Sequence, residues 1–400
     1  MSKHVLASVL FLFSVAWANA ESLKIYLDAD RQANFASARS IEIGVRAAFD
    51  EVGDQIQGFR VEFVPLDHRA NSRRAQKHLE RFANDPEAIA VIGGLHSPPY
   101  LQAKAYVNEN GIPLLLPWSA AAPLTRSRNG SNSIFRVSLD DSKAAEILAN
   151  NVLSDERCQH ISILLWESGW GRSNERTLTR ALVKRRFDKF QILFFSGNLK
   201  EPDAISLASQ VAAAASDCVI FVGNAPEGAT ILNTFFASGT TPKVFSHWGI
   251  SGGTFEKKVN HSVRSALDLT FIQPCFDFDG STPHAAQRLR RIRASFIEDF
   301  DGEGYLSAPA GMFHGFDLGV LLIEALQKID LSLEAGARRL ALVQALENIE
   351  GPVVGLLRSY ERPFADPSHG EDAHEALELQ DFCMAQFDSN DKIVPMARGF

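Results

Sequence analysis

The feature that most constrains the fold is a regular alternation of short apolar runs with longer amphipathic stretches. In the first part of the chain the apolar runs span residues 23–27, 59–66, 89–92 and 112–116. The amphipathic stretches between them span residues 40–52, 72–83 and 97–111. Strands that alternate with helices predict a parallel, doubly wound sheet with right-handed crossovers. We therefore expect an α/β fold in this part of the chain.

A second series repeats the pattern further along the chain. Its apolar runs span residues 161–166, 191–195, 218–222 and 244–247, with helical stretches at 173–184, 202–215 and 227–238. Two Rossmann-like lobes are therefore predicted. Extended runs at 134–137, 269–276 and 351–357 are interpreted as three segments that cross between the lobes and form a hinge.

The crossings predict how the chain divides between the lobes. Residues 21–137 and 275–350 are assigned to the first lobe, and residues 138–274 and 351–400 to the second. A ligand cleft is expected where the carboxyl ends of the two parallel sheets face each other.

The first twenty residues are typical of a secretory signal peptide. Lys3 and His4 precede an apolar run over residues 5–17, and Ala18-Asn19-Ala20 provides the small-x-small pattern of a cleavage site. We expect cleavage after Ala20 and an exported product. An uncleaved anchor is the alternative. The absence of a cysteine near this junction argues against a lipid anchor. No later run reaches the length of about 20 apolar residues that a membrane helix needs.

The size, charge and cysteine content of the chain restrict the class of protein further. The chain has 400 residues, enough for two lobes, and a formal net charge of −8, which disfavours nucleic acid and anionic membranes as partners. Four cysteines allow three pairings into two disulfides. Cys158 and Cys218 each stand at the start of an apolar run, so they are candidates to meet at one end of a sheet. Free buried thiols are the alternative.

The segment 90–99 contains the first candidate site. An apolar run ends at Gly93-Gly94, and Ser97 is expected to cap a helix whose first turn holds Pro98 and Pro99. The start of a helix presents unpaired N–H groups and a partial positive charge, so it suits a carboxylate or a similar anion. An ordinary strand–helix turn is the alternative.

These features, in their order and spacing, resemble the periplasmic solute-binding proteins of the branched-chain amino-acid type, which serve ABC importers. The resemblance covers nearly all of the mature chain. It is carried by residues 44–50, the Asp67 loop, VIGGLHS ending at Ser97, Pro117 with the small-residue turn after it, Trp170-Gly171, residues 222–227 and Gly315-Phe316-Asp317.

The resemblance implies where a ligand binds. A ligand carboxylate would be taken by Ser97 and by the backbone N–H groups of the turn Trp118, Ser119 and Ala120. Trp170 would cover the ligand from the second lobe. Asn224 ends a strand on the predicted cleft side and is a further candidate, with a loop anchor as its alternative role.

Two positions depart from the family pattern. Ala120 stands where relatives place a threonine hydroxyl, with Ser119 as a possible substitute, and Trp248 stands where relatives place the acid that pairs with a ligand ammonium. A buried ammonium without a counter-charge is unfavourable. We therefore expect a small carboxylate or an apolar or aromatic compound rather than a standard α-amino acid. An amino-acid-binding protein of the same type is the alternative.

No catalytic, metal or cofactor site is expected. The chain lacks GxSxG at the Ser97 loop, the phosphate-loop pattern, and the HxH, HExxH and CxxC patterns. The expected role is a monomeric, periplasmic binding protein that is not an enzyme. Its partners would be a small ligand and the permease of an ABC importer. A ligand-binding sensory subunit for a membrane kinase or cyclase remains the alternative.

Overall fold

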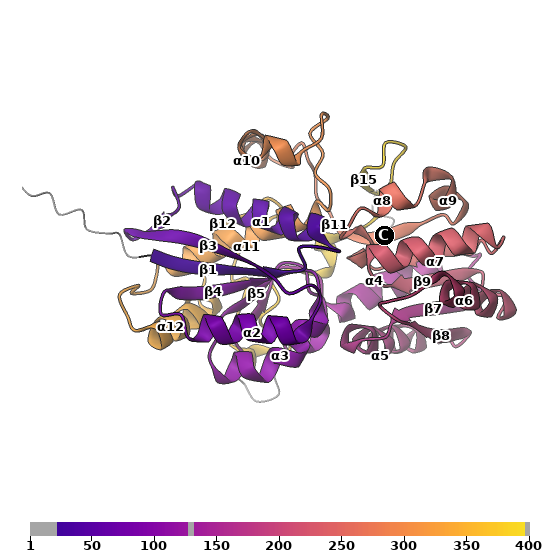
Figure 1. Ribbon diagram of the computed structural model, residues 1–400, viewed down its shortest axis with the longest axis horizontal. Helices are drawn as coiled ribbons and strands as arrows, with labels where there is room; N and C mark the ends of the chain where they lie inside the picture. Colours follow the sequence, from indigo (N-terminus) through magenta and orange to yellow (C-terminus); the bar gives the residue numbers. More distant parts are fainter. Residues whose placement is uncertain (1–21, 127–131, 397–400) are drawn as a thin grey trace, which may run out of the picture.

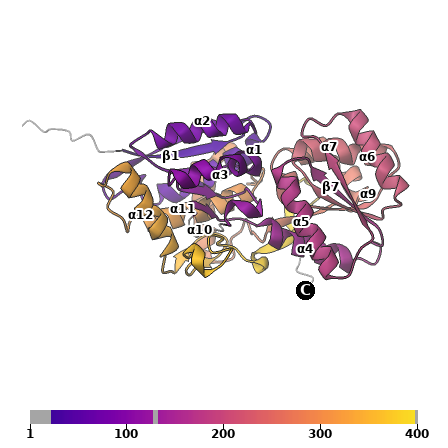
Figure 2. The same cartoon turned by 90° about the horizontal axis from the view of Figure 1, so that it is seen from below.

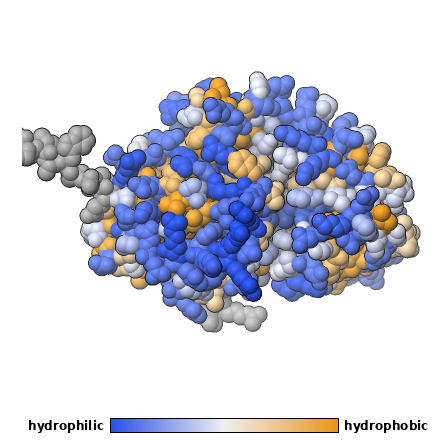
Figure 3. All heavy atoms as spheres, viewed as in Figure 1, coloured by the Kyte–Doolittle hydropathy of each residue, from blue (hydrophilic) through white to orange (hydrophobic). Residues whose placement is uncertain are grey.

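The computed structural model describes residues 22–126 and 132–396 and shows two lobes side by side (Figures 1 and 2). The predicted signal peptide and its cleavage site lie outside the described residues. Within the described ranges, no helix has the length and apolar character needed to cross a membrane. On the face shown in Figure 3, hydrophilic side chains predominate and apolar ones form small separate groups.

The first lobe is built on a six-stranded sheet of order β2-β3-β1-β4-β5-β6. Every neighbouring pair is parallel except β2 with β3. The strands are β1 (Ser22–Ala29), β2 (Gln55–Ile56), β3 (Phe59–Asp67), β4 (Ala88–Gly93), β5 (Leu114–Leu116) and β6 (Ile134–Arg136). The helices around it are α1 (Phe35–Asp50), α2 (Ser72–Ala83), α3 (Ser97–Glu109), α10 (Pro283–Ser295), α11 (Ala310–Leu326) and α12 (Ala335–Glu347).

The second lobe is built on a seven-stranded sheet of order β15-β14-β11-β10-β9-β7-β8, in which β14 and β15 run antiparallel to their neighbours. The strands are β7 (Ile161–Trp166), β8 (Phe190–Phe195), β9 (Cys218–Val222), β10 (Lys243–Ser246), β11 (Thr270–Pro274), β14 (Phe382–Phe387) and β15 (Ile393–Pro395). The helices are α4 (Asp141–Ser154), α5 (Gly169–Lys184), α6 (Glu201–Ala213), α7 (Ala225–Ala237), α8 (Phe255–Lys258) and α9 (His261–Ala266).

The predicted fold class is confirmed, and several elements have the predicted bounds. Helix α2 and strands β7 and β9 begin and end at the expected residues. Local chemistry explains the first case, because the side chain of Asn71 accepts a hydrogen bond from the Arg74 amide and so caps α2 at its amino end.

The predicted third crossing at residues 351–357 is wrong. This segment forms a hairpin of β12 (Val353–Val354) and β13 (Ser359–Tyr360) that is held on α11. Asp317 of α11 accepts hydrogen bonds from the Leu356 amide and from the Tyr360 hydroxyl (2.7 Å). A carboxyl buried in the first lobe requires such donors, and the hairpin supplies them.

The chain stays with the first lobe beyond this hairpin. The ring of Phe364 lies 5.0 Å from that of Phe135, and Glu375 pairs with Arg136 at the end of β6. The chain enters the second sheet only at β14. The assignment of residues 351–377 to the second lobe is therefore revised, whereas the other boundaries stay predictions.

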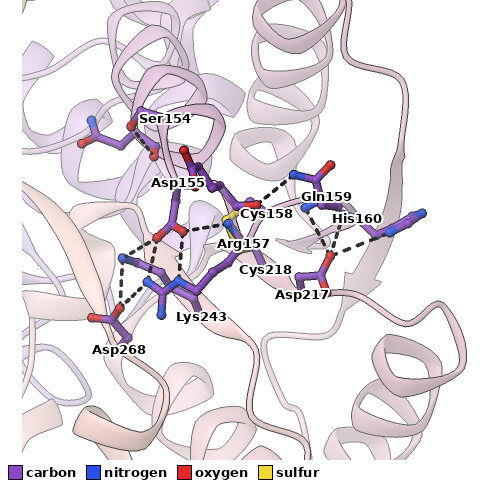
Figure 4. The surroundings of a disulfide bond; sticks show 12 residues. Ser154, Asp155, Arg157, Cys158, Gln159, His160, Asp217, Cys218, Lys243 and Asp268 are labelled. Atoms are coloured by element: carbon purple, nitrogen blue, oxygen red, sulfur yellow. Dashed lines mark hydrogen bonds and ion pairs between the residues drawn. A yellow bond between two sulfur atoms is a disulfide. The ribbon is translucent and has the colours of Figure 1, made fainter.

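Both disulfides lie in or beside the second sheet. Cys158–Cys218 joins the segment before β7 to the first residue of β9. Around it, Asp155 binds Arg157 and Lys243, which also contact Asp268 (Figure 4). Cys275–Cys383 joins the chain leaving β11 to β14, the two neighbouring strands through which the chain passes between the lobes. The structure thus selects one of the three pairings that the sequence leaves open.

Candidate functional site

The predicted ligand-binding residues gather where the carboxyl ends of the two sheets meet. Ser97 begins α3 after β4, the turn 118–121 follows β5, and the remaining residues follow β7, β9 and β10. The two lobes touch here, since the Ser37 amide donates to the Gly252 carbonyl (3.1 Å). The rings of Trp118 and Trp248, one from each lobe, lie 5.7 Å apart.

Ser97 is not the N-cap of α3. His96 occupies that position, and its side chain makes no capping bond. Buried Ser97 instead uses its hydroxyl oxygen to accept a hydrogen bond from the Ala121 amide (3.1 Å). The helix start and the turn after β5 therefore lie together, as the resemblance implies, but the amide facing Ser97 comes one residue after the predicted 118–120.

The turn leaves one side-chain donor free. The Ser119 hydroxyl donates to the Gly94 carbonyl (2.7 Å), so its proton is not available as a substitute for the missing threonine. The carbonyl of Ala120 accepts from the Asp141 amide (2.9 Å). The indole N–H of Trp118 is buried and has no partner among the described residues.

Aromatic rings from the second lobe form the opposite side. Trp170 is buried, and its ring lies 6.4 Å from that of Trp166 and 5.0 Å from that of His247. Trp248 is also buried and packs edge-on against Phe382, close to the crossing segments. Asn224 precedes α7, is buried, and caps no helix amide.

Asp141, the first residue of α4 after the first crossing, also lies at the site and was not predicted from the sequence. It is fully buried, and its Oδ1 accepts hydrogen bonds from Trp170 Nε1 (2.9 Å) and Asn174 Nδ2 (2.8 Å). Its Oδ2 has no hydrogen-bond partner in the described part of the chain, and Nε2 of His247 lies 3.5 Å from Oδ1. The site therefore contains a carboxyl group, that of Asp141, although Trp248 occupies the position at which relatives place their acid. The only sequence signal is the pair Asp140-Asp141, which is typical of a helix start.

A second polar group lies beside Ser97 in the first lobe. His96 Nε2 lies 3.2 Å from Asp30 Oδ2 and 3.1 Å from Asn34 Nδ2. Burial opposes ionisation of Asp30, but hydrogen bonds from His96, Asn34 and the Gln32 amide outweigh it and lower its pKa. Because His96 faces Asp30 and Ser97 faces the Ala121 amide, these neighbours do not form the nucleophile–base pair of a hydrolase.

The site chemistry is that of binding. Donors from the first lobe face a buried acid, an imidazole and aromatic rings from the second. In the part of the chain that the structure describes, no three His, Cys, Asp or Glu side chains are placed to hold a metal ion. Two parallel α/β lobes that enclose polar groups at their carboxyl ends define a two-lobed binding protein.

Comparison with known proteins identifies the family. The model described as "Periplasmic binding protein" matches residues 29–377, and the chain belongs to this family, within the type 1 class that includes leucine- and branched-chain amino-acid-binding proteins. Membership implies a periplasmic location and a fold of the solute-binding rather than the catalytic kind.

Individual relatives are distant. An amino acid binding protein from Pseudomonas aeruginosa is 22% identical over 195 residues, 49% of this chain, so the chain spans about half (51%) of the curated relative it matches. A leucine-binding protein from Thermotoga maritima is 17% identical with a TM-score of 0.73, covering 94% of this chain and 98% of that one.

A solute-binding protein of an ABC transporter from R. palustris, solved with benzoate, shares 14% identity with a TM-score of 0.74, covering 94% and 95% of the two chains. At these identities the solved structures show a shared fold.

Proposed function

We propose that this protein captures a small molecule between its two lobes in the periplasm and delivers it to an ABC importer. The proposed ligand is a small carboxylate or a compound with an apolar or aromatic body. The observation that carries the proposal is the indole N–H of Trp118, which has no partner among the described residues; Trp118 belongs to the turn that holds the Ser97–Ala121 contact, and its ring lies 5.7 Å from that of Trp248 in the other lobe.

The donor that the site leaves without a partner favours a ligand that carries a hydrogen-bond acceptor. An indole N–H only donates, and leaving a buried donor unsatisfied costs about 1–3 kcal/mol. A carboxylate oxygen satisfies it. The rings of Trp118, Trp170 and Trp248 offer apolar contact area for the rest of the ligand. The R. palustris protein solved with benzoate shows that this fold accommodates an aromatic carboxylate.

The competing ligand is an α-amino acid, and Asp141 is the residue that favours it. One oxygen of Asp141 already accepts two hydrogen bonds, so only Oδ2 is left for a ligand ammonium. The names of the Pseudomonas aeruginosa and Thermotoga maritima relatives support this alternative. A sensory subunit is the other alternative, and no feature of the site favours it over transport.

Calorimetric titration decides between the ligand classes. Benzoate, and the deaminated analogues of leucine and phenylalanine, are expected to bind more tightly than the two amino acids. Trp118→Phe keeps a ring but removes the donor, so it should weaken carboxylate binding by about tenfold. Tyr106→Phe on α3, which removes a donor from a half-buried ring outside the candidate site, is the control. Micromolar binding of the amino acids that Asp141→Asn abolishes, with no binding of the analogues, would overturn the proposed ligand class.

The proposed capture requires lobe closure about the crossing segments. A monomer whose lobes rotate should have a smaller radius of gyration with ligand bound than without it. Small-angle scattering measures this change. An unchanged envelope at a ligand concentration that saturates the calorimetric signal contradicts closure while leaving binding intact.

A further inference from the structure

A groove of about 720 Å³ lies outside the candidate site, between α3 of the first lobe and α5 of the second. These helices are in contact across the boundary between the lobes, and Figure 2 shows them on the facing sides of the two lobes. None of the seven predicted ligand-binding residues lines this groove. It is therefore a separate feature that both lobes build together.

The groove is strongly basic, in contrast to the acidic chain around it. Lys104 and Arg126 line it from the first lobe, and Arg176 and Arg180 from the second. Glu371 is the only acidic residue in its lining. The chain as a whole has a formal net charge of −8, so this concentration of positive charge is local.

Most of these cations have no counter-charge. Arg176 and Arg180 are exposed, lie one turn apart on α5, and make no ion pair among the described residues. Lys104 donates to the backbone carbonyls of Pro123 and Arg126 rather than to a carboxylate. Burial, and then the nearby Arg136, lower the pKa of Lys104.

Arg126 is the exception among the four cations, because it pairs with Asp140 (2.9 Å) and lies 3.8 Å from Glu375 and 3.9 Å from Glu371. Lys104 of α3 and the two arginines of α5 line the same groove, so positive charge from both lobes gathers there. Like charges that approach each other oppose that approach. An anion placed between them converts the repulsion into attraction to both lobes.

We propose that this groove binds a small polyvalent anion of the polycarboxylate or phosphate class, which bridges the lobes and stabilises their closed arrangement. The volume lies within the range of small-molecule sites, about 300–1,000 Å³. Guanidinium groups match carboxylate and phosphate oxygens in paired hydrogen bonds, and the Ser173 hydroxyl adds a further donor, whereas that of Thr177 already donates to a carbonyl of its own helix. Because both lobes contribute, the anion favours the closed population.

Calorimetry with citrate on the full mature chain tests the proposal, at constant ionic strength maintained with sodium chloride. Citrate should bind and acetate should not. The double variant Arg176→Gln/Arg180→Gln should weaken citrate binding by about tenfold or more. Lys189→Gln removes an exposed cation of the same lobe outside the groove and should leave the affinity unchanged. Scattering should show a smaller radius of gyration with citrate for the parent than for the double variant.

The outcomes separate this groove from the candidate ligand site. Citrate affinity that Trp118→Phe leaves intact and the arginine variant reduces supports the groove. Equal citrate affinity in the parent and the double variant overturns the proposal, as does loss of binding in Trp118→Phe alone, which would place citrate in the candidate site. Neither result depends on which compound the candidate site itself takes.

Discussion

The two lobes share one architecture but are stabilised by different means. In the first lobe, α1 and α11 pack at glycines: a β-carbon on Gly44 would lie 2.2 Å from the Met312 carbonyl oxygen, and one on Gly315 would lie 2.6 Å from that of Ile41. The second lobe instead contains Cys158–Cys218 within its sheet. The first lobe thus joins two helices by close backbone packing, and the second joins β9 covalently to the segment before β7, although it too has close glycine contacts, such as Gly171 on the Trp166 carbonyl.

The largest expected effect is the loss of the second lobe's disulfide. Cys158→Ala/Cys218→Ala opens a link that spans 60 residues of sequence, for which loop-closure entropy predicts a loss of about 4 kcal/mol in the free energy of unfolding. Denaturant unfolding measures the loss. Hydrogen exchange should accelerate in β7 and β9 but not in α1 and α11. Uniform acceleration in both lobes would contradict their independence.

The first lobe is tested at Gly44. Gly44→Ala places a methyl group against the backbone of α11, so the helices must separate, and we expect a loss of about 1–3 kcal/mol in the free energy of unfolding. Gly336→Ala in α12 is the control, because a β-carbon there meets no atom within 4 Å. If Gly44→Ala and Gly336→Ala have equal stability, glycine packing does not hold this lobe together.

Much of the fold was predictable because local signals agree with it. The apolar runs at 161–166 and 218–222 became β7 and β9 without a change of bounds, since buried parallel strands require continuous apolar residues. The Asn71 cap fixed the start of α2. The segment 351–357 failed because an apolar run does not reveal its partner, which is a buried Asp317 on a distant helix.

The candidate site was predictable in location but not in chemistry. The strand ends placed Trp118, Trp170 and Trp248 at one edge, and the structure brings them together. The contact of Trp170 with Asp141 was not predictable, because 29 residues separate them and only the packing of α4 on α5 joins them. Their roles in binding stay predictions.

Binding should draw on both lobes. Ser97→Ala in the first lobe should weaken ligand affinity by about 0.5–3 kcal/mol through the lost hydrogen bond. Trp170→Ala in the second should weaken it by a similar or larger amount through lost apolar contact. Titration of the preferred ligand measures both, with exposed Ser154→Ala as the control. If both variants bind the ligand as tightly as the parent, the ligand binds elsewhere in the protein.

The smallest expected effect is a difference in how stability responds to pH. Asp317 in the first lobe is fully buried, and burial raises its pKa to about 7 despite hydrogen bonds from Leu356, Leu357 and Tyr360. Glu227 in the second lobe is mostly buried, which raises its pKa to about 7 as well. Both carboxyls have a higher pKa folded than unfolded, so folding favours their protonated forms. Their contribution to stability is present at low pH and is lost as the pH rises from about 4 to about 7.

Asp317→Asn and Glu227→Gln each remove one of these titrations. The free energy of unfolding of each variant should therefore fall less steeply between pH 5 and pH 8 than that of the parent, by at most about 1.4 kcal/mol per pH unit. His68 and His314 have lowered pKa values, about 4 and about 3, so their titration makes the free energy of unfolding rise with pH. Because the parent and both variants contain these histidines, their contribution cancels when the slopes are compared. Urea unfolding at each pH supplies the slopes.

The two variants should also differ in stability at pH 8. Asp317 accepts three hydrogen bonds, and a carboxylate is a better acceptor than the amide that replaces it, so Asp317→Asn should lower the free energy of unfolding. Glu227 has an Oε2 without a partner among the described residues, so Glu227→Gln should raise the free energy of unfolding. Identical slopes in the parent and both variants would show that neither carboxyl is protonated in the folded lobes at neutral pH.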